Sequence, residues 1–195
     1  MSTHQQLLYH VVFSTKNRKP YLRNEEFRES VFAYLAGVAK EIGGYALIVG
    51  GYFEHAHLLV RIPAKVAVSN FVGKVKGNTS KHINETSQII KKFGWQDGFG
   101  AFTVSPSQKN SVYQYIANQM QHHAAESFES EHLRLLDKHE VQYDPRFVWE
   151  SLSLGRNCAD PSGLKSHALD GAGDSLPMPF TLATTAHFLA VRTPA

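Results

Sequence analysis

The sequence predicts an α+β fold in which a single antiparallel sheet carries two helices on one face. Two observations predict it. Four short runs are rich in β-branched and aromatic residues, as strands are. Between them, two segments repeat apolar residues at helical spacing. The order along the chain is strand, helix, strand, strand, helix, strand. With 195 residues, 43% of them apolar, the chain is long enough to bury one core of this kind.

Three strands and one helix are expected before Pro63, which ends the third strand. The first strand stops at a polar, proline-containing turn, and the next two are neighbouring antiparallel runs. The helix has Asn24 as its N-cap and stops at Gly43-Gly44. The predicted strands cover residues 7–14, 45–54 and 56–62, and the helix covers residues 25–42.

A second helix and a fourth strand complete the pattern. Ser69 is the expected N-cap of the helix, whose apolar face includes Phe71 and Val75 and whose other faces carry lysines. The fourth strand covers Phe99 to Ser105, and a third helix is expected from Asn110 to about Ser127. The resulting βαββαβ order is the ferredoxin-like, or split βαβ, arrangement. RNA-recognition modules share it, so topology alone does not identify the function.

The composition changes after Trp149, where Gly, Pro, Ser and Ala dominate and charge becomes sparse. We expect residues 1–150 to form the functional domain and residues 151–195 to be a largely disordered extension. No apolar run reaches the roughly 18 residues of a membrane span, and the first residues do not resemble a signal peptide. The single cysteine, Cys158, suits a reducing compartment. A cytoplasmic location without membrane attachment is therefore expected.

The net charge of +3 is weak evidence for a polyanionic partner, but the excess of cations lies entirely in the first 150 residues. There the cations cluster after the first strand and on the second helix. Phosphate contacts supply affinity without reading sequence, so these clusters are candidate DNA-backbone contacts. Solvated surface charge is the alternative interpretation. The candidates are Lys16, Arg18, Lys74, Lys76 and Lys81.

Aromatic residues in the loop before the fourth strand could contact DNA bases. Trp95 and Phe99 are candidates for stacking on unpaired bases. Loop aromatics at a sheet edge more often fill the core, which is the alternative.

Two histidines, His55 and His57, flank Ala56 at the start of the third predicted strand. Strand side chains alternate between faces, so both imidazoles emerge together, whereas Glu54 points to the opposite face and is left out of the site. Two imidazoles on a stiff strand leave coordination positions open for a third ligand and a substrate. The motif therefore predicts an open, catalytic metal site. Histidines that are merely hydrogen-bonded within the strand are the alternative.

The third predicted helix presents a phenol, an amide and an imidazole on one stripe. Tyr115, Gln119 and His122 fall within about 60° of one another on a helical wheel, with His123 at the edge. The neighbouring apolar stripe consists of Val112, Ile116 and Met120.

This stripe suggests phosphodiester chemistry. A tyrosine phenol can attack a phosphodiester, and it needs a metal to polarise the phosphate because its own pKa is near 10. Gln119 would be the third ligand of Mg²⁺ or Mn²⁺. Tyr115 is the predicted nucleophile, and Tyr113, which points away from Gln119, is the rival. His122 is a candidate auxiliary residue for the leaving oxygen or the phosphate, with a solvated helix end as the alternative.

Four ordered blocks within residues 4–150 resemble the single-tyrosine HUH transposases of bacterial insertion sequences and the related REP-associated tyrosine transposases. The blocks are His10–Lys16, His55-Ala56-His57, Trp95–Phe102, and Tyr115–Gln119 followed by His122-His123. The resemblance implies that His55, His57 and Gln119 are metal ligands and that Tyr115 is the nucleophile.

The resemblance also implies a substrate and an assembly. The substrate is single-stranded DNA near hairpin-forming element ends, cut and rejoined through a 5′-phosphotyrosine link. The assembly is a homodimer joined sheet edge to sheet edge, in which the tyrosine helix of one subunit can complete the metal site of the other. Three other functions stay open: a ferredoxin-like nucleic-acid-binding protein without catalysis, a replication-initiator-type HUH nickase, and a small metallohydrolase that uses a metal-bound water.

Overall fold

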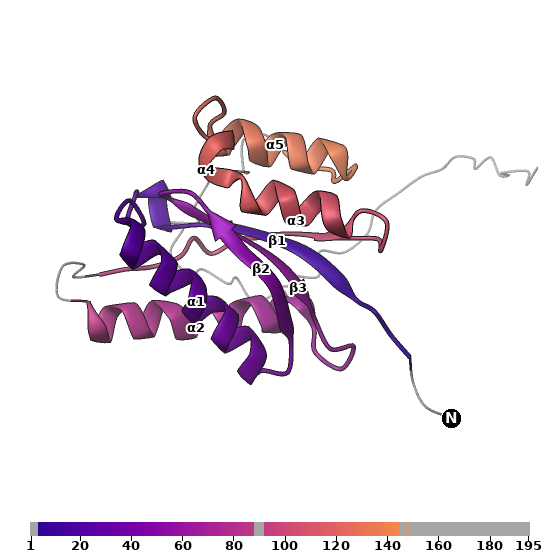
Figure 1. Ribbon diagram of the computed structural model, residues 1–195, viewed down its shortest axis with the longest axis horizontal. Coiled ribbons are helices and arrows are strands. Elements are labelled where there is room, and N and C mark those ends of the chain that lie inside the picture. Colours follow the sequence, from indigo (N-terminus) through magenta and orange to yellow (C-terminus); the bar gives the residue numbers. More distant parts are fainter. Residues whose placement is uncertain (1–3, 88–91, 145–147, 149–195) are drawn as a thin grey trace, which may run out of the picture. The chain divides into compact units, whose positions relative to one another are not determined.

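The computed structural model describes residues 4–87, 92–144 and 148. They form one four-stranded antiparallel sheet in the order β2-β3-β1-β4, with helices on both faces (Figure 1). The strands are β1 (Leu8–Ser14), β2 (Tyr45–Gly51), β3 (His55–Arg61) and β4 (Gly100–Thr103). The predicted α+β class is confirmed, and the strand order is that of a split βαβ fold. The extension expected over residues 151–195 lies outside the described residues.

Helices α1 (Glu25–Glu41) and α2 (Val68–Thr86) cover one face of the sheet (Figure 1). The predicted N-cap of α1 is confirmed, because Asn24 Oδ1 accepts a hydrogen bond of 2.8 Å from the backbone N–H of Phe27. The predicted cap of α2 is wrong, because that helix begins at Val68, before Ser69, and has no side-chain cap. The main core fills the space between this face and the two helices, and it includes Val11, Phe13, Leu35, Leu58, Val60, Phe71 and Val75.

The other face of the sheet carries α3 (Lys109–Ala117), α4 (Gln119–His122) and α5 (Phe128–Lys138) (Figure 1). Alternation along β3 sends Ala56, Leu58 and Val60 toward the main core, so His55 and His57 face these helices. Leu59, on the same side as the histidines, packs in a smaller cluster with Leu8 and Ile116. The sheet therefore separates the main core from the histidine pair.

The single helix predicted over residues 110–127 is wrong. It breaks at Asn118, whose φ of −99° and ψ of 18° are not helical, and α4 then runs for one turn. The break re-aims the side chains that follow, so Gln119 is buried whereas Met120, predicted on the apolar stripe, is exposed. Gln119 points toward β3, where its Oε1 lies 3.3 Å from His55 Nε2.

Helix α5 was not predicted. Its start has a recognisable pattern, since Ser127 Oγ accepts a hydrogen bond of 3.2 Å from the backbone N–H of Ser130 and two glutamates occupy the first turn. Its apolar residues, including Phe128, Leu135 and Leu136, pack on Val12 and Phe102 of the sheet. Among the described residues, no helix is long and apolar enough to cross a membrane.

Candidate active site

The two strand histidines lie at the start of β3, fully buried, with ring centroids 4.9 Å apart. Both point to the side of the sheet that α3, α4 and α5 cover. His57 Nε2 has no hydrogen-bond partner among the described residues and lies 3.4 Å from Glu131 Oε2, while His55 Nε2 lies 3.7 Å from the same oxygen. Buried imidazole nitrogens that face a carboxylate in this way are suited to share a divalent cation with it.

A third histidine orients the second. His10 Nε2 on β1 lies 2.9 Å from His57 Nδ1, and the two rings stack with centroids 5.1 Å apart. Burial lowers the pKa of His10 well below its usual range and that of His57 to about 4, so both rings are neutral at pH 7. A proton on His57 Nδ1, donated to His10, leaves His57 Nε2 with its lone pair toward the site. No role for His10 was predicted from the sequence.

Glu131 of α5 occupies the centre of the site and is completely buried. Its Oε2 lies 3.0 Å from His123 Nε2 and faces the strand histidines, while its Oε1 accepts a hydrogen bond of 2.9 Å from Gln119 Nε2. Burial alone would raise the pKa of Glu131, but the hydrogen bond from His123 and the neighbouring imidazoles of His57 and His55 lower it well below its usual range. The carboxylate is therefore ionised, and it contacts both Gln119 of α4 and the histidines.

Four side chains form a group that could hold a metal. The ligand atoms of His55, His57, His123 and Glu131 all lie within 4.8 Å of one another. Gln119, the predicted third ligand, lies at the edge of this group, with its Oε1 3.3 Å from His55 Nε2. Three imidazoles, one carboxylate and one amide oxygen provide the nitrogen and oxygen donors of a divalent metal site. The cluster fits such a site.

Tyr115 of α3 adjoins this group. Its hydroxyl donates a hydrogen bond to Glu131 Oε1, and its ring centroid is 6.0 Å from that of His57. Burial, followed by the charge and hydrogen bond of Glu131, raises the pKa of Tyr115 above its usual range. The phenol is therefore protonated in this arrangement. Tyr113, the rival nucleophile, is exposed on the same helix.

The exclusion of Glu54 from the site was wrong. Its Oε1 lies 3.2 Å from His55 Nδ1, which leaves His55 Nε2 directed toward Gln119 and Glu131. The alternation of side chains along a strand does not extend to Glu54, because β3 begins at His55 and residue 54 belongs to the bend before it. Glu54 therefore contacts the outer nitrogen of a candidate ligand.

His122, the candidate auxiliary residue, lies outside the buried group. Its Nε2 is 2.8 Å from Glu126 Oε2 and 3.0 Å from Arg134 Nη2. Its ring is 5.2 Å from that of Tyr115 by centroid. His123 takes the inner position, with its side chain buried against Glu131.

The structure contradicts the predicted DNA contact of Lys76. Lys76 is only 8% exposed. Its ammonium donates hydrogen bonds to the carbonyl oxygens of Gln96, Asp97 and Gly98, the last two at 3.0 and 2.9 Å. These bonds hold the loop before β4, because a buried ammonium needs such partners.

The other cations predicted to contact DNA lie at the surface. Lys74 and Lys81 are exposed on α2, across the sheet from the histidines. Lys16 is exposed in the short 3₁₀ turn Lys16–Arg18, and Arg18 forms an ion pair of 2.9 Å with Glu129 of α5. Of these four cations, Arg18 is thus the one that contacts a helix covering the site.

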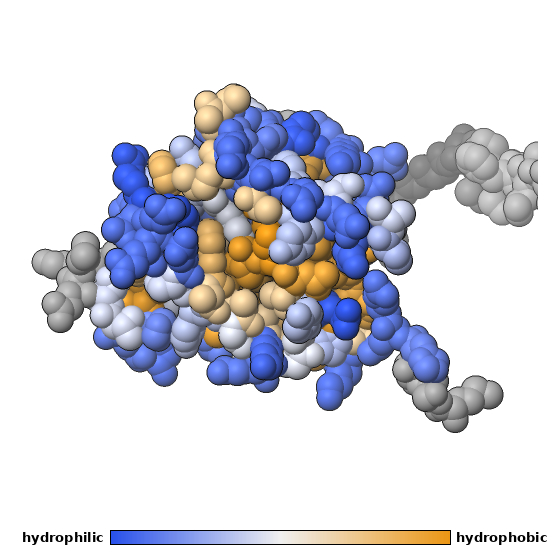
Figure 2. Space-filling model, in the orientation of Figure 1, coloured by the Kyte–Doolittle hydropathy of each residue, from blue (hydrophilic) through white to orange (hydrophobic). Residues whose placement is uncertain are grey.

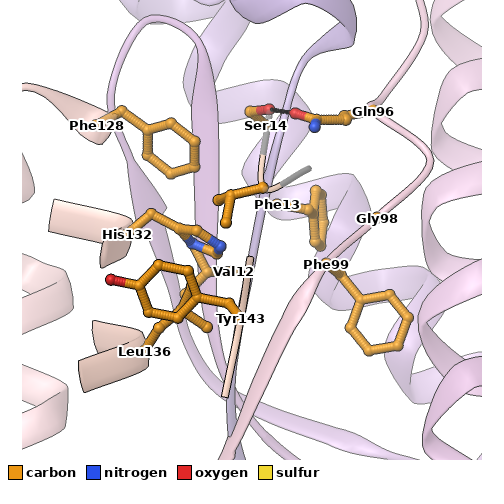
Figure 3. A pocket seen from close by; sticks show the side chains of 11 residues that line it. Val12, Phe13, Ser14, Gln96, Gly98, Phe99, Phe128, His132, Leu136 and Tyr143 are labelled. Atoms are coloured by element: carbon orange, nitrogen blue, oxygen red, sulfur yellow. Dashed lines mark hydrogen bonds between the residues drawn. The ribbon is translucent and has the colours of Figure 1, made fainter. Parts of the chain in front are cut away.

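The two loop aromatics differ. Trp95 is buried against Phe13 and Phe93, which is the core-filling alternative. Phe99 is exposed and lines a pocket of about 220 Å³ between β1, the loop before β4 and α5 (Figure 3). Helix α5 presents Phe128, His132 and Leu136 to this pocket, four residues apart, whereas Glu131 belongs to the active site.

The site is thus a buried cluster of histidines and a carboxylate that could hold a divalent metal, with a tyrosine hydroxyl at its edge, on a ferredoxin-like sheet. Residues 3–119 match the family model of IS200-like transposases. The chain belongs to this family of single-tyrosine transposases, which confirms the family resemblance and the expectation of an enzyme. Glu131 and Arg134 lie beyond the matched residues.

The chain is also similar to a curated transposase and to two solved structures. The transposase for insertion sequence element IS200 of Salmonella typhimurium is 28% identical over 118 residues, which are 58% of this chain and 76% of the relative. A crystal structure of a Deinococcus radiodurans R1 protein assigned as a transposase has a TM-score of 0.51 at 22% identity, over 61% of this chain and 95% of that one, and shows the same fold. A REP-associated tyrosine transposase bound to a REP hairpin is similar over 63% of this chain and 74% of its own, at 15% identity and TM-score 0.47.

Proposed function

We propose that this transposase cuts and rejoins single-stranded DNA at hairpin-bearing element ends through a 5′-phosphotyrosine link to Tyr115. One observation carries the proposal: the Tyr115 hydroxyl and the two strand histidines meet at the same carboxylate, that of Glu131. A phenol beside a metal-binding group is the combination that phosphodiester cleavage by tyrosine requires.

Mg²⁺ or Mn²⁺ would be held by His55, His57 and Glu131, with Gln119 or His123 at the edge. The carboxylate adds a hard oxygen donor to the imidazoles, which suits these ions. The bound ion would polarise the scissile phosphate and lower the charge barrier to attack.

The chain's own residues supply the rest of the step. Tyr115 Oη forms a bond to phosphorus as the bond from phosphorus to the 3′ oxygen breaks. The phenolic proton, which is hydrogen-bonded to Glu131 Oε1 before the attack, is released to the solvent, and a proton from the solvent completes the 3′ hydroxyl. Rejoining is the reverse attack by a 3′ hydroxyl on the phosphotyrosine.

The test is formation of a covalent complex. Purified protein is incubated with labelled single-stranded DNA hairpins in Mg²⁺, Mn²⁺ or EDTA and examined on a denaturing gel. We expect a metal-dependent adduct that Tyr115→Phe abolishes and the matched control Tyr113→Phe retains. Hairpin binding without any adduct would favour a binding protein without catalysis. Metal-dependent cleavage that survives Tyr115→Phe would favour a metallohydrolase.

We also propose that the chain forms a homodimer through β2. This strand is one of the two edges of the sheet, it pairs only with β3 in the described structure, and its residues 46–50 are only half-buried. Figure 2 shows an apolar area in the middle of the surface, where Figure 1 places β2. A second copy could pair with this edge and cover the area. Sedimentation equilibrium at micromolar concentration should give the dimer mass, and a monomer mass would contradict the proposal.

A further inference from the structure

We propose that Arg134 of α5 is a further catalytic residue, whose guanidinium binds the phosphate that Tyr115 attacks. This inference rests on the proposed function and extends it to a helix outside the family match. Arg134 Nη2 donates a hydrogen bond of 3.2 Å to the Tyr115 hydroxyl, and the guanidinium carbon is 5.8 Å from the centre of the phenol ring. In the described part of the chain, no other cationic side chain donates a hydrogen bond to that hydroxyl.

The guanidinium is held in place from one side. Glu126 binds it twice, with Nε at 3.1 Å from Oε1 and Nη2 at 2.8 Å from Oε2, and His122 Nε2 lies 3.0 Å from Nη2. A bidentate carboxylate fixes the plane of an arginine, so little conformational freedom is left to lose when a second anion binds. Glu126 is thus a positioning residue for Arg134.

The Nη1 group of Arg134 is available to DNA. The Arg134 side chain is 44% exposed, unlike the completely buried Glu131. No hydrogen bond within the described structure uses Nη1. When Tyr115 Oη bonds to phosphorus, the non-bridging phosphate oxygens lie next to Oη, within reach of a donor that already contacts it. The two N–H groups of Nη1 can donate hydrogen bonds to these oxygens.

The location of the charge suits the reaction. Negative charge builds on the non-bridging oxygens as the phosphate becomes five-coordinate, and a fixed cation there stabilises it. Glu131 and Arg134, three residues apart on one face of α5, both contact the phenol hydroxyl, the first as acceptor and the second as donor. Helix α5 would thus supply both the acceptor of the phenolic hydrogen bond, Glu131, and the donor to the phosphate, Arg134.

The experiment compares single-turnover rates of adduct formation on the hairpin DNA that gives the strongest adduct above. The variants are Arg134→Gln and Arg134→Lys, and Lys138→Gln is the control because it removes an exposed charge at the end of the same helix. Each protein is tested on the natural DNA and on both stereoisomers of a substrate with one methylphosphonate at the cleaved position. A methyl group removes the charge that Arg134 would bind. Melting temperatures are measured for all variants.

We expect Arg134→Gln to slow adduct formation about 100-fold on natural DNA, the scale of losing one preorganised donor, and Arg134→Lys to slow it less. On one methylphosphonate stereoisomer, the ratio of wild-type to Gln-variant rates should fall to within about fivefold, which a merely structural role would not produce. Equal ratios on all substrates, or a wild-type rate in Arg134→Gln, would overturn this inference alone. Absence of any Tyr115 adduct in the wild type would overturn the proposed function and this inference with it.

Discussion

Glu131 shows how much one side chain can organise. Its Oε1 faces Tyr115 and Gln119, and its Oε2 faces His123 and the strand histidines, so one buried carboxylate joins a helix-borne phenol to a strand-borne histidine pair. A buried carboxylate is stable only with such partners. The ionised state of Glu131 is therefore a property of the assembled site.

Replacing His57 should separate metal binding from folding. His57→Ala removes a candidate ligand, and we expect Mn²⁺ affinity to fall at least about 100-fold, since even changes around a ligand typically cost about 10- to 100-fold. The loss of its contact with His10 should lower the free energy of unfolding by about 1–3 kcal/mol, which leaves the domain folded. Isothermal titration with Mn²⁺ and circular dichroism measure the two effects.

His82→Ala is the control for this change. His82 stacks on Tyr34 on the far side of the sheet, so its loss should leave Mn²⁺ affinity unchanged. An unfolded His57→Ala protein, or unchanged affinity, would show that His57 serves only to stabilise the fold.

The buried histidines should make the metal-free protein acid-sensitive. Burial lowers the pKa of His57 from 6.5 to about 4 and also lowers that of His10, so below pH 6.5 the unfolded chain takes up protons that the folded chain does not. The free energy of unfolding should therefore fall as pH drops from about 6.5 toward 4, by about 2–3 kcal/mol for His57. His123, whose pKa is raised, works in the opposite direction.

This dependence can be measured as melting temperature between pH 7.5 and 4.5 in EDTA. The matched variant His57→Asn should have a shallower dependence than the wild type. A melting temperature that is constant across this range would contradict the assignment of His57 as buried and neutral.

At the level of elements, the approach of α3 to the sheet sets the position of Tyr115. Gly50 of β2 permits that approach, since a Cβ there would lie 2.6 Å from the carbonyl oxygen of Ile116 and 2.9 Å from its Cγ2. The break at Asn118 then turns Gln119 toward the histidines. The absence of a side chain at Gly50 and the non-helical backbone at Asn118 thus bring Tyr115 and Gln119 to the cluster of His55, His57, His123 and Glu131.

Gly50→Ala should push α3 away from the sheet. We expect a loss of about 1–3 kcal/mol in the free energy of unfolding and slower adduct formation, because Tyr115 moves with the helix. Chemical denaturation and the adduct assay measure these effects. Gly73→Ala in α2 is the control, because a Cβ there meets nothing within 4 Å and a helical Ala is more favourable than Gly by about 1 kcal/mol. Equal stability of Gly50→Ala and the wild type would contradict this account.

For the whole molecule, the position of Tyr115, the proposed nucleophile, bears on whether two subunits share an active site. Tyr115 and His57 lie in contact within one chain, with ring centroids 6.0 Å apart. The family resemblance allows the tyrosine helix to act on a partner's histidines, and the single-chain geometry favours a site completed within each subunit.

Mixing two inactive variants tests this point. Tyr115→Phe and His57→Ala, combined after joint refolding, should give no more adduct than either alone, because no subunit then has both groups. Recovery of about a quarter or more of the wild-type adduct would show that tyrosine and histidines from different subunits form the active site.

Local sequence was sufficient for the strands and for the chemistry that one element carries. Alternation along β3 predicted that His55 and His57 share a face. Helical spacing did not decide the position of Gln119 relative to Tyr115, because the helix breaks between them at Asn118. The family blocks identified the transposase class. The strand prediction succeeds because the alternation of side chains between the two faces of a strand depends only on residues that are neighbours in the chain.

The tertiary structure decided what surrounds those residues. His10 reaches His57 from 47 positions away, and Glu131 and Arg134 arrive on a helix that local patterns did not predict. Lys76, which looked like a surface cation, is taken up by three carbonyl groups of a distant loop. Burial and pairing of charges depend on how helices pack on the sheet, and no local period encodes that packing.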